Sequence, residues 1–173
     1  MLQGKTIIIT GGSSGMGLYM AKQFVAEGAN VVIVGRNEER LAEAKEFILA
    51  AGNTIETFQM DVRIPEQAQA MVAFAVEKFG RVDGLVNNAA GNFIVRAEDL
   101  SPNGWKAVVD IVLNGTFYCS SAVGKYWIDQ KINGSIINMV ATYAWNAGAG
   151  VIHSAAAKAG VLSMTRTLAV EWG

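Results

Sequence analysis

The chain has 173 residues, a formal net charge of -1 and 51% hydrophobic residues. This length is typical of one domain with a real core, and the hydrophobic content fits a buried parallel sheet. Nearly balanced charge, with no dense run of Lys or Arg, argues against nucleic acid and anionic membranes as partners. The single cysteine, Cys119, excludes a disulfide framework, and one Cys with one His makes no metal-binding cluster.

The N-terminal residues and the apolar runs favour a soluble protein. The first expected strand begins within a few residues of Met1, which leaves no room for a signal peptide. No uncharged apolar run is long enough to span a bilayer. We therefore expect a soluble, cytoplasmic protein.

Short apolar runs alternate with segments of helical periodicity along the whole chain. The expected strands cover residues 6–9, 30–34, 54–60, 84–87 and 135–140. The expected helices cover residues 18–27, 38–51, 65–79, about 102–130, and 151 to the end. Ser101 is the expected N-cap of the long helix, and Gly52-Asn53 ends the second helix. This alternation predicts an α/β fold, a Rossmann-type doubly wound parallel sheet with helices on both faces, as a single domain over residues 1–173.

A glycine-rich turn joins the first strand to the first helix. In this context the glycines allow a sharp turn and a close approach to a pyrophosphate, and the helix N-terminus favours its charge. An ordinary glycine-rich turn is the alternative. The expected cofactor-binding residues of this turn are Gly11, Ser13, Ser14, Gly15, Met16 and Gly17.

The spacing of Gly11, Gly15 and Gly17 after Thr10 resembles the T-G-x-x-x-G-x-G loop of the short-chain dehydrogenase/reductase family. The resemblance covers essentially the whole chain and implies a nicotinamide dinucleotide cofactor. It implies that Asp61 and Val62 contact the adenine, and that Asn88, Ala89 and Ala90 form the segment beside the cofactor ribose. It also implies a homo-oligomer, usually a tetramer formed through two long helices. Because family members continue with two further strands and a substrate-covering loop, we expect the sequence to stop inside the domain.

The end of the second expected strand bears on the choice between NAD and NADP. An acidic residue about 20 residues past the glycine loop binds the ribose 2′-hydroxyl in NAD-dependent folds. Here Gly35 leaves space for a 2′-phosphate, Arg36 can pair with it, and Ser13 can add a hydroxyl donor. The sequence therefore favours NADP(H), unless Arg36 merely caps the strand and faces water.

The chain departs from the usual catalytic pattern of the family. Most members have a Tyr-x-x-x-Lys pair, a serine thirteen residues before the tyrosine, and an asparagine on the preceding long helix. Lys158 and Asn114 match that pattern, but Ser154 stands at the tyrosine position and Ala141 at the serine position. Reduction of a ketone leaves an alkoxide that needs a strong proton donor. Hydride addition to a C=C conjugated with a thioester instead spreads charge into a dienolate, which needs hydrogen-bond donors at the thioester oxygen.

Residues 87–93, with Tyr143, Ser154 and Lys158 at these spacings, resemble the NADPH-dependent 2,4-dienoyl-CoA reductases of this family. The resemblance implies an acyl-CoA thioester as substrate and a 3-enoyl-CoA as product, in unsaturated fatty acid degradation. It implies that Lys158 holds the nicotinamide ribose, and that Ser154 touches nicotinamide or substrate. Tyr143 and Asn92 would bind the thioester oxygen. Phe93 is a further expected substrate contact, and Asn114 would support Lys158 through a water.

Each of these residues has a simpler interpretation. Tyr143 could be a packed aromatic beside Trp145, Asn92 a turn residue and Ser154 an inert helix-face serine. His153 is interpreted as a loop or helix-edge residue and not as a base. Two other functions also stay open: a carbonyl reductase in which Tyr143 is a relocated acid, and a non-catalytic NADP-binding regulatory protein.

Overall fold

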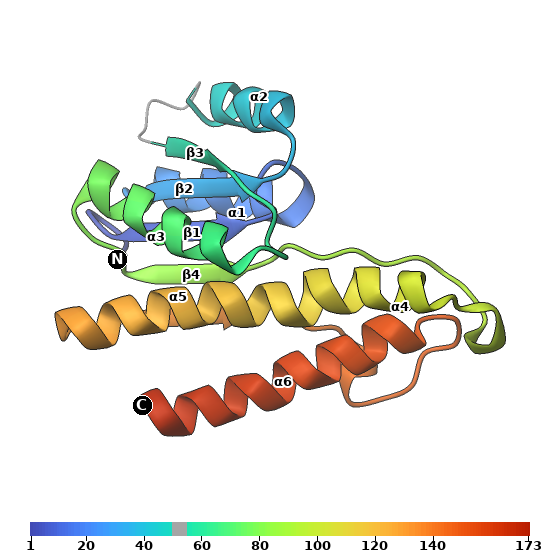
Figure 1. Ribbon diagram of the computed structural model, residues 1–173. Helices are drawn as coiled ribbons and strands as arrows, with labels where there is room; N and C mark the ends of the chain where they lie inside the picture. Colours follow the sequence, from blue (N-terminus) through green and yellow to red (C-terminus); the bar gives the residue numbers. More distant parts are fainter. Residues whose placement is uncertain (50–54) are drawn as a thin grey trace.

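Five parallel strands form one sheet in the order β3-β2-β1-β4-β5. The computed structural model describes residues 1–49 and 55–173 (Figure 1). The strands are β1 Thr6–Thr10, β2 Asn30–Gly35, β3 Ile55–Gln59, β4 Gly84–Asn87 and β5 Ser135–Asn138. Strand order and direction confirm the predicted doubly wound sheet, in which all carboxyl ends meet at one edge.

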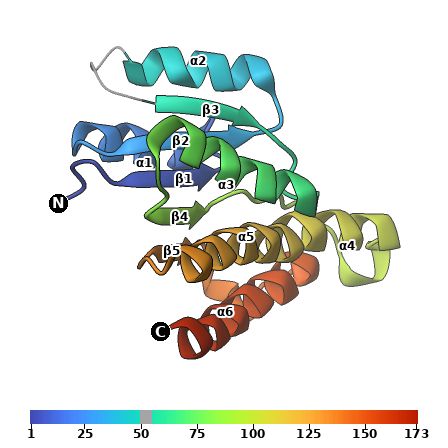
Figure 2. The ribbon, with the colours of Figure 1, turned by 60° about the vertical axis from the view of Figure 1, so that its left-hand side comes forward.

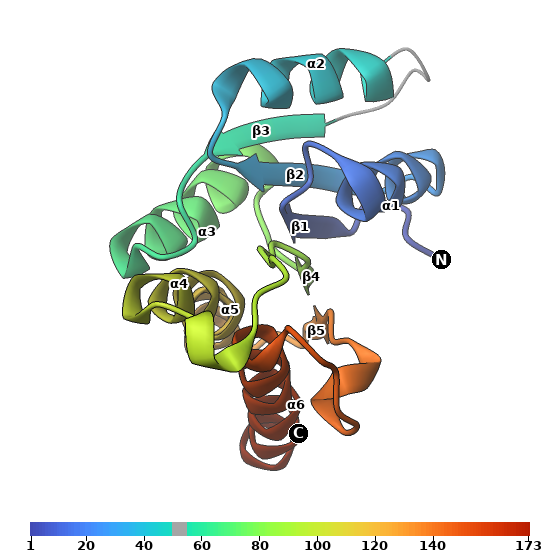
Figure 3. The ribbon, with the colours of Figure 1, turned by 90° about the vertical axis from the view of Figure 1, so that its right-hand side faces the viewer.

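Helices cover both faces of the sheet (Figures 2 and 3). On one face lie α1 and α2, and on the other lie α3 and the long α4–α5 rod, with α6 packed alongside that rod. The bounds are α1 Gly15–Ala26, α2 Glu38–Leu49, α3 Pro65–Phe79, α4 Pro102–Val109, α5 Gly115–Gln130 and α6 Ile152–Trp172. Two short 3-10 turns, η1 Ala97–Asp99 and η3 Thr142–Ala144, lie in the loops after β4 and β5.

Alternate residues of the central strands supply two separate cores. Ile7 and Ile9 of β1 pack with the buried residues of α1 and α2, whereas Ile8 packs with those of α3 and α5. Because both faces are covered, β1 is buried along its whole length, and its sequence is a continuous apolar run between two threonines. The sheet is thus a rigid base for the loops at its carboxyl edge.

The segment Pro102–Gln130 has 29 residues, and an 18-residue window within it has a mean hydropathy of 1.3, enough by length and composition to cross a membrane. In the fold it packs against α3, β4 and α6, and its residues Cys119, Val123 and Trp127 are part of the core. The Trp127 indole donates a hydrogen bond to the Val82 carbonyl at 2.8 Å. Core packing therefore accounts for the apolar character of this helix.

Several expected bounds of helices and strands differ from the structure. The helix expected over 102–130 contains a π-helical segment, η2 Asp110–Asn114, between α4 and α5. The strand expected over 135–140 ends at Asn138, and the Met139 carbonyl that follows accepts a hydrogen bond from the Lys158 side chain. The third strand is shorter than expected at its carboxyl end, and the predicted helix stop at Gly52-Asn53 lies outside the described residues. The expected N-cap is confirmed, because Ser101 Oγ accepts from the Gly104 N–H at 3.1 Å.

Candidate functional site: a dinucleotide cavity and an adjoining cluster of polar side chains

The glycine turn lies between the end of β1 and the start of α1, as predicted. Gly11 and Gly15 have left-handed backbones, with φ of 66° and 53°, which glycine adopts without strain. A Cβ at Gly17 would lie 2.4 Å from the Gly11 carbonyl oxygen and 2.6 Å from Asn88 Nδ2. A Cβ at Gly15 would meet nothing within 4 Å. The turn is therefore tightly packed against the protein at Gly17 and has free space at Gly15, the arrangement that a phosphate-binding turn needs.

Asn88 and Thr10 bind this turn to the loop after β4. The Asn88 side-chain amide donates to the carbonyls of Thr10 and Gly11 at 3.0 and 3.1 Å. Thr10 Oγ1 accepts from the backbone N–H groups of Asn88 and Ala89 at 3.1 and 3.0 Å. The Asn88 side chain thus holds the glycine loop in place, and Thr10, which the sequence analysis did not single out as functional, is its partner.

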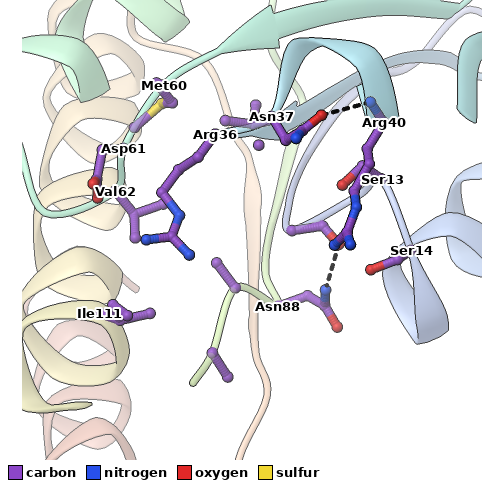
Figure 4. A pocket seen from close by; sticks show the side chains of 15 residues that line it. Ser13, Ser14, Arg36, Asn37, Arg40, Met60, Asp61, Val62, Asn88 and Ile111 are labelled. Atoms are coloured by element: carbon purple, nitrogen blue, oxygen red, sulfur yellow. Dashed lines mark hydrogen bonds between the residues drawn. The ribbon is translucent and has the colours of Figure 1, made fainter. Parts of the chain in front are cut away.

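A cavity of about 690 Å³ opens at the carboxyl edge of β1, β2 and β3 (Figure 4). Most of the expected cofactor-binding residues line it: Gly11, Ser13, Ser14, Arg36, Asp61, Val62, Asn88, Ala89 and Ala90. Gly35 lines it too, and a Cβ there would lie 3.4 Å from Ser13 Oγ. Within the described part of the chain, the cavity wall does not include Gly15, Met16, Gly17 or Lys158.

A second guanidinium group at this cavity was missed from the sequence. Arg40 and Asn37 line the wall together with Arg36, and both arginine side chains extend toward the cavity in Figure 4. The Asn37 side-chain oxygen accepts from the Arg40 backbone N–H at 2.8 Å, which caps the start of α2. The signal was present in the sequence, because Arg40 follows Arg36 by one helical turn beyond a capping asparagine. Met60 and Ile111 supply apolar wall that no motif indicated.

Asp61 lines the cavity, and its carboxylate pairs with Arg63. The Arg63 Nε donates to both carboxylate oxygens, at 2.9 and 3.0 Å. These side-chain hydrogen bonds are the main reason why the pKa of Asp61 lies below its usual range. The carboxylate therefore stays ionised and fixed in orientation at neutral pH.

The structure brings the expected catalytic residues Tyr143 and Ser154 together. Tyr143 Oη lies 3.0 Å from Ser154 Oγ, so a hydroxyl from the turn η3 reaches the first turn of α6. Lys158 lies one turn further along α6, is buried, and donates to the Met139 carbonyl. Burial lowers the pKa of its ammonium group. In the described structure these three residues lie outside the wall of the 690 Å³ cavity.

Among the described residues, the other expected site residues have no side-chain hydrogen bond to Tyr143 or Ser154. The Asn114 amide donates to Asp110 Oδ1 at 2.9 Å within the π-helical segment. Asn92 is exposed in the loop after β4, and Phe93 beside it has 42% of its surface exposed. His153 is on α6 as expected at a helix edge, but its side chain is completely buried.

Comparisons with known proteins match this architecture. Residues 5–173 match the family model described as short chain dehydrogenase. A protein of Bacillus subtilis strain 168, named "Probable 2,4-dienoyl-CoA reductase" and (2E)-enoyl-CoA-producing, is 62% identical over 99% of this chain and 68% of its own length. The mouse peroxisomal 2,4-dienoyl-CoA reductase, named (3E)-enoyl-CoA-producing, is 42% identical over 100% of this chain and 59% of its own length.

A solved structure is also closely similar. The crystal structure of a short chain dehydrogenase from Bacillus anthracis is 65% identical, with a TM-score of 0.97 over 100% of this chain and 72% of that one. The mouse reductase is longer than this chain, which spans only 59% of its length. With its glycine cradle, its sheet and the match over residues 5–173, the chain belongs to the short-chain dehydrogenase family of oxidoreductases.

Proposed function

We propose that the protein is an NADPH-dependent reductase of 2,4-dienoyl-CoA thioesters. The observation that carries this proposal is the contact between Tyr143 and Ser154 at the start of α6. Ser154 stands four residues before Lys158, where most family members have tyrosine, and its hydroxyl lies 3.0 Å from Tyr143 Oη. The name of the 62% identical Bacillus subtilis relative supports the same activity.

The cavity fits a nicotinamide dinucleotide that carries a 2′-phosphate. Arg36 and Arg40 bring two guanidinium groups to a wall that also contains Ser13 and Gly35. Planar guanidinium forks suit phosphate oxygens, and β2 ends without a carboxylate that would repel them. When bound, the cofactor supplies a hydride. We expect Ser14, Gly15 and the α1 N-terminus to hold the pyrophosphate, and Lys158 to hold the nicotinamide ribose.

The reaction needs charge to be stabilised on the substrate. Hydride addition at C5 of the dienoyl group breaks the C4=C5 π bond and gives a dienolate with charge on the thioester oxygen. Tyr143 and Asn92 would donate hydrogen bonds to that oxygen, since preformed donors stabilise developing oxyanions. A solvent proton at C2 then gives a 3-enoyl-CoA, whereas a proton at C4 gives a 2-enoyl-CoA.

The experiment is NADPH oxidation followed at 340 nm with a 2,4-dienoyl-CoA, run in D2O with the product identified by mass spectrometry and NMR. We expect NADPH loss and one deuterium at C2. Deuterium at C4 would instead indicate a 2-enoyl-CoA product, as in the (2E)-enoyl-CoA-producing name of the Bacillus subtilis relative. The absence of any turnover, with tight NADPH binding, would support the non-catalytic regulatory function instead.

A carbonyl reductase is the second candidate function. The same Tyr143–Ser154 contact favours it, because it places a phenol within one hydrogen bond of the position where the family's usual acid lies. A 3-ketoacyl-CoA distinguishes the two functions. We expect no NADPH loss with this substrate, because reduction of a ketone needs a strong proton donor at the tyrosine position, where this chain has Ser154.

Two broader expectations remain predictions. We expect the protein to act in the cytoplasm as a homotetramer. Sedimentation equilibrium with and without NADPH measures the second directly.

A further inference from the structure

His153 is a buried polar side chain that the proposed mechanism does not use. It is completely buried in the first turn of α6, directly before Ser154. Among the described residues, neither Nδ1 nor Nε2 of its ring has a hydrogen-bond partner. Burial of an unpaired polar ring costs stability, so its presence calls for a physical reason.

The ring of His153 packs against Phe93 in an edge-to-face arrangement. The two ring centroids are 4.5 Å apart and the planes are inclined by 67°. Such geometry is attractive beyond the area it buries. Phe93 follows Asn92 in the loop after β4, so the contact joins the Asn92 segment to the helix that carries Ser154 and Lys158.

Two glycines hold the same segment from other directions. The Val95 N–H donates to the Gly150 carbonyl at 3.0 Å, and a Cβ at Gly150 would lie 2.9 Å from the Ile94 side chain. A Cβ at Gly104 would lie 3.0 Å from Phe93 Cζ. Tyr143 belongs to this arrangement, since a Cβ at Gly148 would lie 3.4 Å from its Cβ. The loop with Asn92 and the loop with Tyr143 therefore pack against a common turn, residues 148–151.

We infer that His153 is a positioning residue that fixes the Asn92–Phe93 segment relative to Tyr143 and Ser154. This inference rests on the proposed function, in which Asn92 and Tyr143 bind the same oxygen. Asn92 is exposed, so the contact of the neighbouring Phe93 with His153 helps to set its position, together with the Val95–Gly150 hydrogen bond. The unpaired imidazole of His153 lowers the stability of the fold, while its contact with Phe93 keeps the two donors, Asn92 and Tyr143, aligned.

The first test replaces His153 by leucine, which keeps an apolar side chain of similar volume and removes the unpaired nitrogens. We expect an unchanged or raised Tm, unchanged NADPH binding and KM for dienoyl-CoA within twofold, but kcat lower by about 10-fold because the donors lose alignment. Ile152→Ala, at an exposed neighbouring position, is the matched control and should behave like the wild type.

A second readout does not depend on the reaction. Arg96 lies at the end of the same segment with an 80% exposed side chain, so trypsin can cleave there once the segment is released. We expect His153→Leu to accelerate cleavage after Arg96 several-fold, with cleavage after Arg81 unchanged as a measure of global unfolding. If the wild type proves inactive on dienoyl-CoA, the proposed function is wrong. The cleavage comparison still decides in that case whether His153 holds the segment.

A double-mutant cycle with Phe93→Leu tests whether the two rings act through each other. Phe93→Leu and His153→Leu should each lower kcat, and the double variant should be no worse than the more affected single variant. Additive losses, an unchanged cleavage rate at Arg96, or a His153→Leu kcat within twofold of the wild type would each overturn the inference. If His153→Leu does not fold, the Arg96 cleavage rate of Phe93→Leu decides alone.

Discussion

A serine at position 154, in contact with a tyrosine from another loop, distinguishes this site from the usual pattern of the family. Tyr143 and Ser154 are 11 residues apart in sequence, and their hydroxyls are 3.0 Å apart in space. The usual Tyr-x-x-x-Lys spacing of the family does not find the phenol at 143, because this residue is not on the helix that carries Lys158. In the proposed function, activity depends on which of these hydroxyls faces the substrate oxygen and on how firmly it is held.

We expect Tyr143→Phe to lower kcat with dienoyl-CoA by about 100-fold, because one donor to the dienolate oxygen is lost. NADPH affinity, measured by fluorescence titration, should stay within twofold. Tyr19→Phe, at a side chain that is 65% exposed on α1, is the control. Full activity of the Tyr143 variant would remove this residue from the mechanism.

We expect Arg36→Ala and Arg40→Ala each to raise KM for NADPH by about 10- to 100-fold, since each removes a charged partner of the 2′-phosphate. KM for NADH should hardly change, because NADH lacks that phosphate. Steady-state kinetics with both cofactors checks this, with the exposed Arg166→Ala on α6 as the control. An equal loss with both cofactors would mean that the guanidinium groups support the fold and not the phosphate.

At the scale of elements, the glycine turn after β1 packs directly against the loop after β4. The Asn88 amide, the Gly11 carbonyl and Gly17 are so close that no side chain fits at position 17. Within the π-helical segment before α5, the Asn114 amide donates a hydrogen bond to Asp110 Oδ1 at 2.9 Å. Between these elements, the geometry of the turn depends on how closely the backbones approach one another.

Gly17→Ala is the sharpest test at this scale. Its Cβ would lie 2.4 Å from the Gly11 carbonyl oxygen, so the turn must shift. We expect a loss of about 1–3 kcal/mol in the free energy of unfolding and at least tenfold weaker NADPH binding. Gly84→Ala is the matched control, because a Cβ there would have only ordinary contacts, at 3.5 Å and beyond. Normal NADPH binding by Gly17→Ala would contradict the prediction that the glycine turn holds the pyrophosphate.

At the scale of the whole molecule, ion pairs fasten the amino edge of the sheet, opposite the site. Asp83 is 9% exposed and accepts from the Thr6 N–H at 3.0 Å, from Arg81 Nε at 2.9 Å and from Lys5 at 3.0 Å. Although burial opposes ionisation, these hydrogen bonds lower the pKa of Asp83. The pKa values of Asp61 and Asp110 are lowered as well, chiefly by hydrogen bonds from Arg63 and Lys106.

These shifts predict an acid-sensitive fold. A carboxyl whose pKa is lower in the folded state stabilises the fold above its unfolded pKa of about 3.9, and this contribution is lost as pH falls through the folded value. Urea unfolding should therefore show stability declining from about pH 5 downward. Asp83→Asn should cost about 2 kcal/mol at pH 7 and flatten the acid decline. An unchanged pH dependence in this variant would assign the decline to other groups.

The sequence by itself determined the family, the sheet and the position of the glycine-rich turn, because these depend on local patterns: apolar strand runs, helical periodicity and the spacing of Gly11, Gly15 and Gly17. It also determined most of the cavity wall, since residues that follow parallel strands must gather at one edge. Only the tertiary structure decided that Tyr143 meets Ser154 and that His153 is buried against Phe93. These are contacts between separate loops and helices, and their geometry is set by packing across the whole fold and not by any local pattern.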